Sequence, residues 1–351
     1  MARSSGSGWT YASSGVDRGA ISAALAALLS GIRYRAPPAA GRVVAARGHF
    51  AGLVRVDGTT LALTTDTVGT KVALAEAVGR FEEVGEDLVG VNVNDLAAVG
   101  ARPVGLLDTI VAHRVDAAVL RSIGRGMDRG LRRAQCHLLG GETAVVGEQV
   151  AGWELGATAV GYFPKGRRPV LGHALRPGDH LIGLRSNGFH ANGYTLIRRL
   201  LSERSVDVTV PRPGGRTAVG RELLRPTRIY SRVVDRIADA PTLHGLAHLS
   251  GGGVRNLVRL HDARAFVLDR WPRPPGLFGW IQELGGLDDR EMFQTFNMGI
   301  GFVLAVAHGT AAAWIARLAR AGARDARVIG RVTKGCGVTL PDRGLAFEGY
   351  A

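Results

Sequence analysis

Three acidic residues stand where an apolar segment gives way to a turn or to amide side chains. Asp66 lies in TTDTVGTK at the end of a Thr-rich, strand-like segment, Asp95 lies in VNVNDLAAVG, and Glu142 follows the glycines of LLGGET. The hard cation Mg²⁺ prefers one or two carboxylates together with phosphate oxygens. The repeated placement of an acid at the edge of an element therefore favours a metal–phosphate site.

The same segments carry groups that suit the phosphates of a nucleotide. Lys71 follows Gly69 and opens an apolar run, and a lysine acts on phosphate as a point charge. The pair Gly140–Gly141 would let backbone N–H groups approach an anion. Amides are poor choices inside an apolar helical stretch, and a metal–phosphate site nearby would explain Asn92 and Asn94.

These groups do not form a P-loop, because the GxxxxGK[ST] spacing is absent. Structural explanations therefore stay open at this point. Asp66 could cap an element, Lys71 could extend along the surface, and the Asn residues could cap the start of a helix.

Two further loops are rich in glycine and asparagine and precede predicted helices. RSNGFHANGY, residues 185–194, places His190 between two Asn-Gly pairs, and HLSGGGVRN, residues 248–256, contains three consecutive glycines. A loop that leads into a helix is a frequent anion site, and a histidine can donate a hydrogen bond or transfer a proton near neutral pH. We predict that the first loop recognises a substrate; the alternative is that it only caps the helix that begins near Tyr194.

Residue patterns predict the elements that position these side chains. Asp17 is a favourable N-cap before an amphipathic helix, and Asp57-Gly58 predicts a tight turn between two strands. Strands and helices interleave, so the predicted fold class is α/β or α+β. The further helices are predicted over 84–99, 116–134 and 194–201, and the further strands over 104–111, 136–139 (short and buried), 153–162 and 180–184.

Composition narrows the class of protein. The 351 residues are 46% hydrophobic, which suffices for two packed domains, and no segment has the roughly 20 apolar residues that a membrane span needs. The net charge is +14, but the basic residues are 41 dispersed arginines and three lysines, so we expect no nucleic-acid partner and no membrane partner. Cys136 and Cys336 are far apart, which argues against a disulfide framework. The amino-terminal segment has no secretory pattern, and we expect a cytoplasmic protein.

The motifs follow one another as in the aminoimidazole ribonucleotide synthetases, and the chain resembles this family over nearly its whole length. SNGFHANGY, PTRIY, HLSGGG and MFQTFNMGIG are specific to the family, and SSGVD at 13–17 also matches it. TD-x-VGTK, NDL and GGET are shared with a wider superfamily that includes thiamine monophosphate kinase and selenophosphate synthetase.

The resemblance implies two α/β domains, over 1–168 and 169–351, and a homodimer whose amino-terminal sheets pack together. It implies that ATP phosphorylates the amide oxygen of formylglycinamidine ribonucleotide, after which the amidine nitrogen closes the imidazole ring and phosphate leaves. Lys71 and His190 would be catalytic, with Lys71 neutralising the γ-phosphate. The implied ATP-binding residues are Asp66, Gly69, Thr70, Lys71, Asn94, Asp95, Gly140, Gly141 and Glu142, of which Asp66, Asp95 and Glu142 would hold Mg²⁺. The implied substrate-binding residues are Ser186, Asn187, His190, Asn192, Gly251, Gly252 and Gly253.

Several positions depart from the family pattern, chiefly in the nucleotide half. Thr67 stands in place of a glycine, Val145 and Val146 replace a Glu-Met pair, and His49 and Ala51 replace glycines. Two alternatives therefore stay open. One is a paralogue or superfamily kinase that phosphorylates a related small substrate, and the other is a catalytically inactive binding protein of the same fold.

Overall fold

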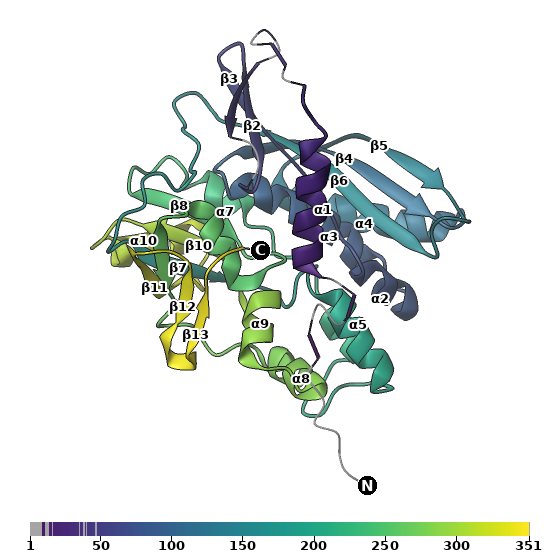
Figure 1. Ribbon diagram of the computed structural model, residues 1–351. Helices are drawn as coiled ribbons and strands as arrows, with labels where there is room; N and C mark the ends of the chain where they lie inside the picture. The colour runs from purple at the N-terminus through teal and green to yellow at the C-terminus, as the bar shows by residue number, and fades with distance from the viewer. Residues whose placement is uncertain are drawn as a thin grey trace.

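The computed structural model describes residues 9–10, 14–15, 17–34, 36–37, 39, 41–45 and 48–350. This part of the chain forms two β-sheets with helices packed beside them (Figure 1), which confirms the predicted mixture of α and β structure. Ser13 and Val16 of the SSGVD motif lie outside the described residues.

The amino-terminal sheet, sheet A, has six strands in the order β1-β2-β3-β6-β4-β5. Strands β2 and β3 form the predicted hairpin, and its turn residues Asp57 and Gly58 have φ values of 44° and 79°, as a tight turn of this kind requires. Strands β4 and β5 are parallel and are connected by helix α4. The strands are β1 (Arg42–Ala45), β2 (Gly52–Val56), β3 (Thr59–Thr67), β4 (Arg102–Ala112), β5 (His137–Val145) and β6 (Trp153–Tyr162).

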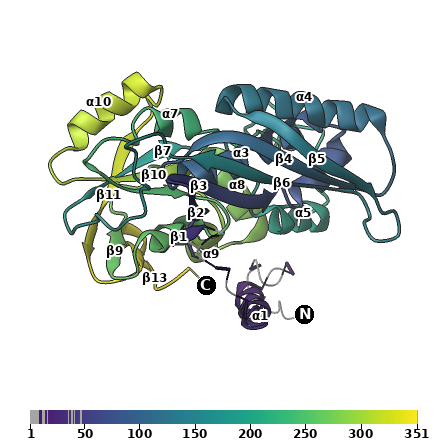
Figure 2. The same cartoon turned by 90° about the horizontal axis from the view of Figure 1, so that it is seen from above.

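Helices α3 (Glu82–Ala97) and α4 (Ala117–Ala134) cover one face of sheet A, as Figure 2 shows. Helix α4 begins where Asp116 accepts hydrogen bonds from two backbone N–H groups, and α3 is buried along almost its whole length. The opposite face of the sheet carries exposed apolar side chains: Leu63 (40% exposed), Val104 (37%) and Leu107 (43%). Sheet A is therefore apolar on both faces but covered on only one by the described elements.

The carboxy-terminal sheet, sheet B, has seven strands in the order β13-β12-β9-β11-β7-β10-β8, and β10 is buried at every position. Its strands are β7 (His180–Arg185), β8 (Leu243–His248), β9 (Arg264–Val267), β10 (Ile300–Val306), β11 (Arg327–Lys334), β12 (Val338–Leu340) and β13 (Leu345–Phe347). The other helices are α1 (Arg18–Ser30), α2 (Lys71–Val78), α5 (Tyr194–Glu203), α6 (Val219–Leu223), α7 (Ser231–Asp235), α8 (Gly276–Gly285), α9 (Asp289–Thr295) and α10 (Ala311–Ala321), with 3-10 helices η2 (Gly253–Leu260) and η3 (Pro341–Arg343).

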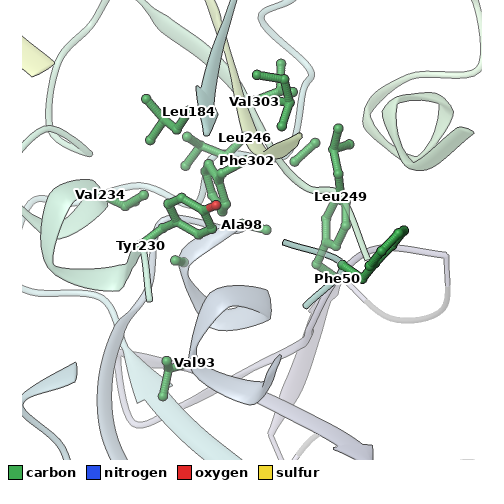
Figure 3. Packing of buried hydrophobic residues seen from close by; sticks show 14 of the residues in the cluster. Phe50, Val93, Ala98, Leu184, Tyr230, Val234, Leu246, Leu249, Phe302 and Val303 are labelled. Atoms are coloured by element: carbon green, nitrogen blue, oxygen red, sulfur yellow. The ribbon is translucent and has the colours of Figure 1, made fainter. Parts of the chain in front are cut away.

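One continuous apolar core joins the two sheets. It runs from α3, through Val93 and Ala98, to β8 and β10, where Leu246 and Phe302 lie (Figure 3). Tyr230 packs with its ring 5.2 Å from that of Phe302. Helix α3 is therefore packed between sheet A and the carboxy-terminal half, and polar residues on α3 lie at the junction of the two halves.

One expectation needs correction. The strand predicted over 136–139 is neither short nor buried: β5 spans nine residues at the edge of sheet A and is exposed along nearly its whole length, with Leu139 54% exposed. Helix α1 begins after the Asp17 cap, as predicted, and its apolar face is exposed at Ile21, Leu25 and Leu28. None of the described helices has the length and apolar character that a membrane span requires.

Candidate functional site

Asp66, Asp95 and His248, called here the carboxylate cluster, meet where α3 passes between sheet A and sheet B. Asn92 holds the backbone of Asp66: its Oδ1 accepts from the Asp66 N–H (3.1 Å), and its Nδ2 donates to the Asp66 carbonyl (3.3 Å). Asp95 follows Asn92 by three residues and so lies on the same face of α3. Its Oδ1 lies 2.8 Å from Nδ1 of His248, the last residue of β8.

The cluster concentrates negative charge in a poorly solvated place. Burial raises the pKa of Asp66 to about 6, and the nearby Asp95 carboxylate adds to the shift. A hydrogen bond from the Thr67 N–H acts in the opposite direction. The buried Nε2 of His248 has no hydrogen-bond partner among the described residues. A bound cation would be stabilised here, because its charge would offset both the poor solvation of Asp66 and the repulsion between the two carboxylates.

Glu142, the third predicted metal ligand, is not brought to this cluster within one chain. The register of sheet A places Asp66, Ala157, Asp108 and Gly141 in one row, while Glu142 pairs with Thr109 in the next row. Neighbouring residues of a strand point to opposite faces, so Glu142 lies on the uncovered face, and three strand spacings of roughly 4.8 Å, about 14 Å in all, separate its strand from that of Asp66. Over the described ranges, no three His, Cys, Asp or Glu side chains are grouped closely enough to hold a metal ion.

The glycines beside Glu142 have a local reason to be there. Gly140 has a φ of 145°, a backbone conformation that residues with a side chain rarely adopt. A Cβ atom on Gly141 would lie 2.3 Å from Oδ1 of Asp108 on the adjacent strand. The close approach of a neighbouring side chain therefore explains Gly141 without any bound anion, and its predicted contact with ATP stays a prediction.

Lys71, predicted to neutralise the γ-phosphate, is fully buried at the start of α2. Its Nζ lies 2.7 Å from Oδ2 of Asp87 and donates to the carbonyl oxygens of His190 (2.8 Å) and Arg225 (2.9 Å). Burial lowers the pKa of Lys71, and the Asp87 carboxylate opposes this shift. The structure thus places Lys71 among protein acceptors from both halves of the chain.

Asn94 is also used by the protein itself. Its Nδ2 donates to the carbonyl of Arg228 (2.8 Å), and its Oδ1 accepts from the N–H of Tyr230 (2.8 Å). Gly69, at a φ of 65°, and Thr70 form the exposed turn before α2, and Thr70 Oγ1 lies 3.0 Å from Thr195 Oγ1. Of the predicted nucleotide-binding residues in this region, Gly69 and Thr70 are accessible, whereas the Asn94 side chain is hydrogen-bonded to the PTRIY segment, residues 226–230.

The predicted substrate loop lies between β7 and α5 and is held by Asn297. Ser186 Oγ donates to Asn297 Oδ1 (3.0 Å), and Asn297 Nδ2 donates to the Gly188 carbonyl (2.9 Å). Asn187 Nδ2 donates to the Pro226 carbonyl (3.4 Å). Helix α5 begins at Tyr194, and its N-cap residue is Gly193, which has no side chain to cap it. The N-cap position is therefore not occupied by an asparagine, as the alternative explanation of this loop would favour.

His190 occupies a conformation that few non-glycine residues adopt. Its φ is 62°, in the left-handed region, and its ring is fully buried, with Cε1 2.4 Å from the position a Cβ would take on Gly301. The Asn187 N–H donates to Nε2 (3.4 Å), which places the ring proton on Nδ1, and this atom has no hydrogen-bond partner among the described residues. Burial lowers the pKa of His190 well below its ordinary value, so the imidazole is neutral.

The glycine loop Gly251–Gly253 lies beside the substrate loop. A Cβ on Gly251 would lie 3.1 Å from Oδ1 of Asn192, whereas one on Gly253 would lie 2.1 Å from the carbonyl oxygen of Phe293. Gly253, at a φ of 54°, is therefore required by packing against α9. Gly251 and Gly252 remain the better candidates for a ligand contact.

Arg259, on η2, connects this loop to the segment that contains His49. Its guanidinium lies 4.1 Å from the Phe50 ring centroid and 5.2 Å from that of Tyr350, and its Nε donates to the Gly48 carbonyl (3.1 Å). The Tyr350 hydroxyl donates to the Gly251 carbonyl (3.1 Å). Arg259 is thus a cation beside the glycine loop and the carboxylate cluster.

Three residues that the structure places at the junction were missed by sequence reasoning: Asp87, His248 and Arg259. His248 carried a signal, since this histidine ends a predominantly buried strand three residues before the glycines. Asp87 carried none, because an acid in the first turns of a helix is an ordinary choice.

Two family descriptions match the chain. The description "AIR synthase related protein, N-terminal domain" matches residues 48–163, and "AIR synthase related protein, C-terminal domain" matches residues 176–343.

The chain belongs to the AIR synthase related family.

Relatives of this family member include two proteins named phosphoribosylformylglycinamidine cyclo-ligase. The protein of Methanothermobacter thermautotrophicus is 40% identical over 304 residues, which cover 85% of this chain and 88% of the relative. That of Methanocaldococcus jannaschii is 36% identical over 326 residues, which cover 92% of each chain.

Solved structures share the AIR synthase-like fold at lower identity. A HypE–HypF complex matches with a TM-score of 0.64 and 16% identity over 90% of this chain and 95% of that chain. AaThiL complexed with AMPPCP and TMP matches with a TM-score of 0.62 and 20% identity over 86% of this chain and 90% of that chain. These likenesses show the fold.

Proposed function

We propose that the protein is an ATP-dependent cyclo-ligase that converts formylglycinamidine ribonucleotide to aminoimidazole ribonucleotide, a step of purine biosynthesis that takes place in the cytoplasm. The observation that carries this proposal is the similarity to proteins of that name across both halves of the chain. In the reaction, ATP phosphorylates the amide oxygen of the substrate, the amidine nitrogen attacks the activated carbon, and the oxygen leaves as part of inorganic phosphate.

The residues of the carboxylate cluster fit a divalent cation. Asp66 and Asp95 offer the hard oxygen ligands that Mg²⁺ prefers, and their crowding, visible in the raised pKa of Asp66, would be relieved by a bound cation. Mg²⁺, when bound with ATP, would neutralise charge on the phosphates. His248 would keep Asp95 oriented through the contact with its Oδ1.

The carboxylate cluster, the substrate loop and the glycine loop lie close together, since the His248 and His190 ring centroids are 6.4 Å apart and a Cβ on Gly251 would lie 3.1 Å from Asn192 Oδ1. Asp66 and Asp95 reach this region from sheet A and α3, and Asn187, Asn192 and Gly251 reach it from the carboxy-terminal half. Since phosphoryl transfer depends on positioning and on charge neutralisation, we assign the cation and phosphates to the carboxylate cluster and the ribonucleotide to the two loops. The Asn amides carry both donors and acceptors, which suits an amidine beside an amide.

The uncovered face of sheet A supports a homodimer. Leu63, Val104, Leu107 and Leu139 are exposed on sheet A, and a contiguous apolar surface of this kind typically marks a protein interface. A second copy on this face would also give Glu142 a route to a metal site, because Glu142 lies on the same face. We therefore assign Glu142 to a site completed by two copies.

Light scattering after size-exclusion chromatography tests the dimer. Leu107→Arg places a charge on the uncovered face and should give a monomer with lower activity. Val210→Arg, at an exposed apolar residue in the carboxy-terminal half, is the matched control and should remain dimeric. A Leu107→Arg variant that keeps the mass of a dimer would contradict this assignment.

The function itself is tested by incubating the protein with ATP, Mg²⁺ and formylglycinamidine ribonucleotide and identifying the product by mass. Ring closure removes the elements of water from the ribonucleotide and yields ADP and phosphate. A product heavier by a phosphoryl group would identify a kinase instead, and a protein that binds both ligands without turnover would identify an inactive binding protein.

A further inference from the structure

A buried ion pair joins the two halves of the chain at one point. Lys71 and Asp87 come from α2 and α3, their charged atoms are 2.7 Å apart, and both side chains are 0% exposed. A buried charge is stable only when the groups around it supply hydrogen bonds. Here those groups come from the carboxy-terminal half, from the loops that contain His190 and Thr227.

Lys71 contacts the backbones of two loops, and Asp87 contacts one of the same two. Lys71 Nζ donates to the carbonyls of His190 (2.8 Å) and Arg225 (2.9 Å). Asp87 Oδ1 accepts from the N–H (2.7 Å) and the hydroxyl (2.6 Å) of Thr227. An ammonium group has three N–H donors. The two carbonyls accept from two of them and the Asp87 carboxylate lies 2.7 Å from the same nitrogen, so the fully buried Nζ is surrounded by protein acceptors and not exposed to a phosphate.

The His190 carbonyl, which accepts a hydrogen bond from Lys71, belongs to a residue with an unusual backbone conformation. A non-glycine residue keeps a left-handed backbone only where its surroundings impose it, and His190 has a φ of 62°. The bond from Lys71 fixes the peptide group directly after the His190 Cα. The same backbone conformation lets the Asn187 N–H reach the His190 ring (3.4 Å), so the substrate loop is held in one arrangement.

We propose that the Lys71–Asp87 pair is an interdomain latch that positions the substrate loop through the His190 carbonyl, and that Lys71 does not contact ATP. Lys71 is then a positioning residue for the ribonucleotide. The part of this inference that concerns catalysis rests on the proposed cyclo-ligase function, whereas the buried state of Lys71 does not depend on it.

If the latch positions only the substrate loop, its removal should impair use of the ribonucleotide and leave ATP binding unchanged. Lys71→Met alone would leave a buried carboxylate unpaired and could prevent folding, so the test uses Lys71→Met/Asp87→Asn, which removes both charges while the introduced amide oxygen can still accept from Thr227. For this double variant we expect kcat/KM for formylglycinamidine ribonucleotide to fall at least about tenfold, since misplaced reacting groups cost about that much or more. The Kd for a non-hydrolysable ATP analogue should stay within about twofold. The exposed Lys165→Met is the matched control and should change neither value.

A second measurement does not depend on turnover or on the variant folding. The chain has only three lysines, and Lys165 and Lys334 are exposed while Lys71 is not. Treatment of the wild-type protein with an amine-acetylating reagent, followed by peptide mass analysis, should modify Lys165 and Lys334 and spare Lys71 until the protein is denatured, with or without nucleotide.

Three results would overturn the latch. One is a tenfold weaker ATP analogue with unchanged ribonucleotide kinetics, and another is a folded double variant with both values unchanged. The third is acetylation of Lys71 at the rate of Lys165 without nucleotide, with protection when ATP binds. A wild-type protein that does not cyclise the ribonucleotide would refute the proposed function instead, and the acetylation pattern would still decide whether Lys71 is buried in the latch.

Discussion

Helix α3 contributes buried polar residues to two groups that behave differently. Asp87 and Asn94 face loops of the carboxy-terminal half, and their hydrogen bonds to Thr227, Arg228 and Tyr230 are short and direct. Asp95, on the same helix, belongs to the carboxylate cluster, where Asp66 has a raised pKa and His248 Nε2 lacks a partner among the described residues.

This difference distinguishes buried polar residues that hold the fold together from buried polar residues that a ligand would complete. A folded chain normally satisfies its buried polar groups, as it does at Asn94 by hydrogen bonds and at Asp87 by hydrogen bonds together with the ion pair to Lys71, and such groups hold the two halves together. Crowded like charges and an unpaired ring nitrogen are retained at a cost to stability, which is expected where a ligand completes the arrangement. We therefore expect single substitutions in the first group to act chiefly on stability and substitutions in the second to act chiefly on turnover.

The largest effect on stability is expected from Lys71→Met. Removing one partner of a fully buried pair leaves Asp87 as an uncompensated charge, and such changes cost about 3–5 kcal/mol. Urea denaturation followed by circular dichroism measures the loss. The double variant Lys71→Met/Asp87→Asn should recover most of it, because no buried charge remains; a single variant as stable as the wild type would place Lys71 outside the latch.

The largest effect on turnover is expected from Asp66→Asn, with a loss of about 10²-fold or more, since the removed charge is needed when cation and phosphate are bound. The stability of the Asp66→Asn variant should instead increase. The pKa of Asp66 is raised to about 6, so above that pH the folded protein holds an unfavourable carboxylate that Asn removes.

Steady-state kinetics and thermal melting at pH 8 measure both quantities. Asp108→Asn is a matched control, because Asp108 lies in the same row of sheet A, two strands away, and also has a pKa raised by burial. The control should keep its turnover. A lower Tm together with unchanged turnover for Asp66→Asn would reverse the distinction drawn between the carboxylate cluster and the group formed by Asp87 and Asn94.

A smaller effect is expected from His248→Phe, which removes the group that orients Asp95. Partners of metal-binding carboxylates typically contribute about 10- to 100-fold to metal affinity or activity, and we expect a loss in that range for the Mg²⁺ dependence of turnover. His248→Asn can still donate to Asp95 and should recover part of it. Equal losses in the two variants would indicate that His248 acts by packing alone.

The smallest expected effect is the pH dependence that His49 adds to stability. Burial lowers the pKa of His49 from 6.5 to about 4. Between these values the unfolded chain binds a proton that the folded chain does not, so stability falls as the pH drops from 6.5 towards 4.

His49→Gln should remove this contribution, at most about 2 kcal/mol after allowance for partial exposure. Melting curves of wild type and variant between pH 7.5 and 4.5 test it: the Tm difference should shift in favour of the variant as the pH falls. A difference that is constant with pH would show that His49 is not buried in its neutral form.

The sequence by itself determined the local elements of this protein. The Asp57-Gly58 turn, the Asp17 cap of α1 and the helical pattern over 84–99 each rest on residues within a few positions of one another, and the structure has an element at each place. The motifs also sufficed for the family, since they lie in order along the chain. Physical preferences of this kind act over short separations, so they can be read from the chain directly.

Only the tertiary structure decided what those residues contact. Asp66, Lys71 and Glu142 occur in similar local patterns, yet Asp66 lies in the carboxylate cluster, Lys71 is bonded to residues 119 and 154 positions away, and Glu142 points to the uncovered face. His248 belongs to the cluster because it contacts Asp95, which lies 153 positions earlier in the chain. The physical reason is that a strand's face is set by its pairing register and a buried charge's partner by the packing of distant segments. Neither is encoded in the few residues around the charge.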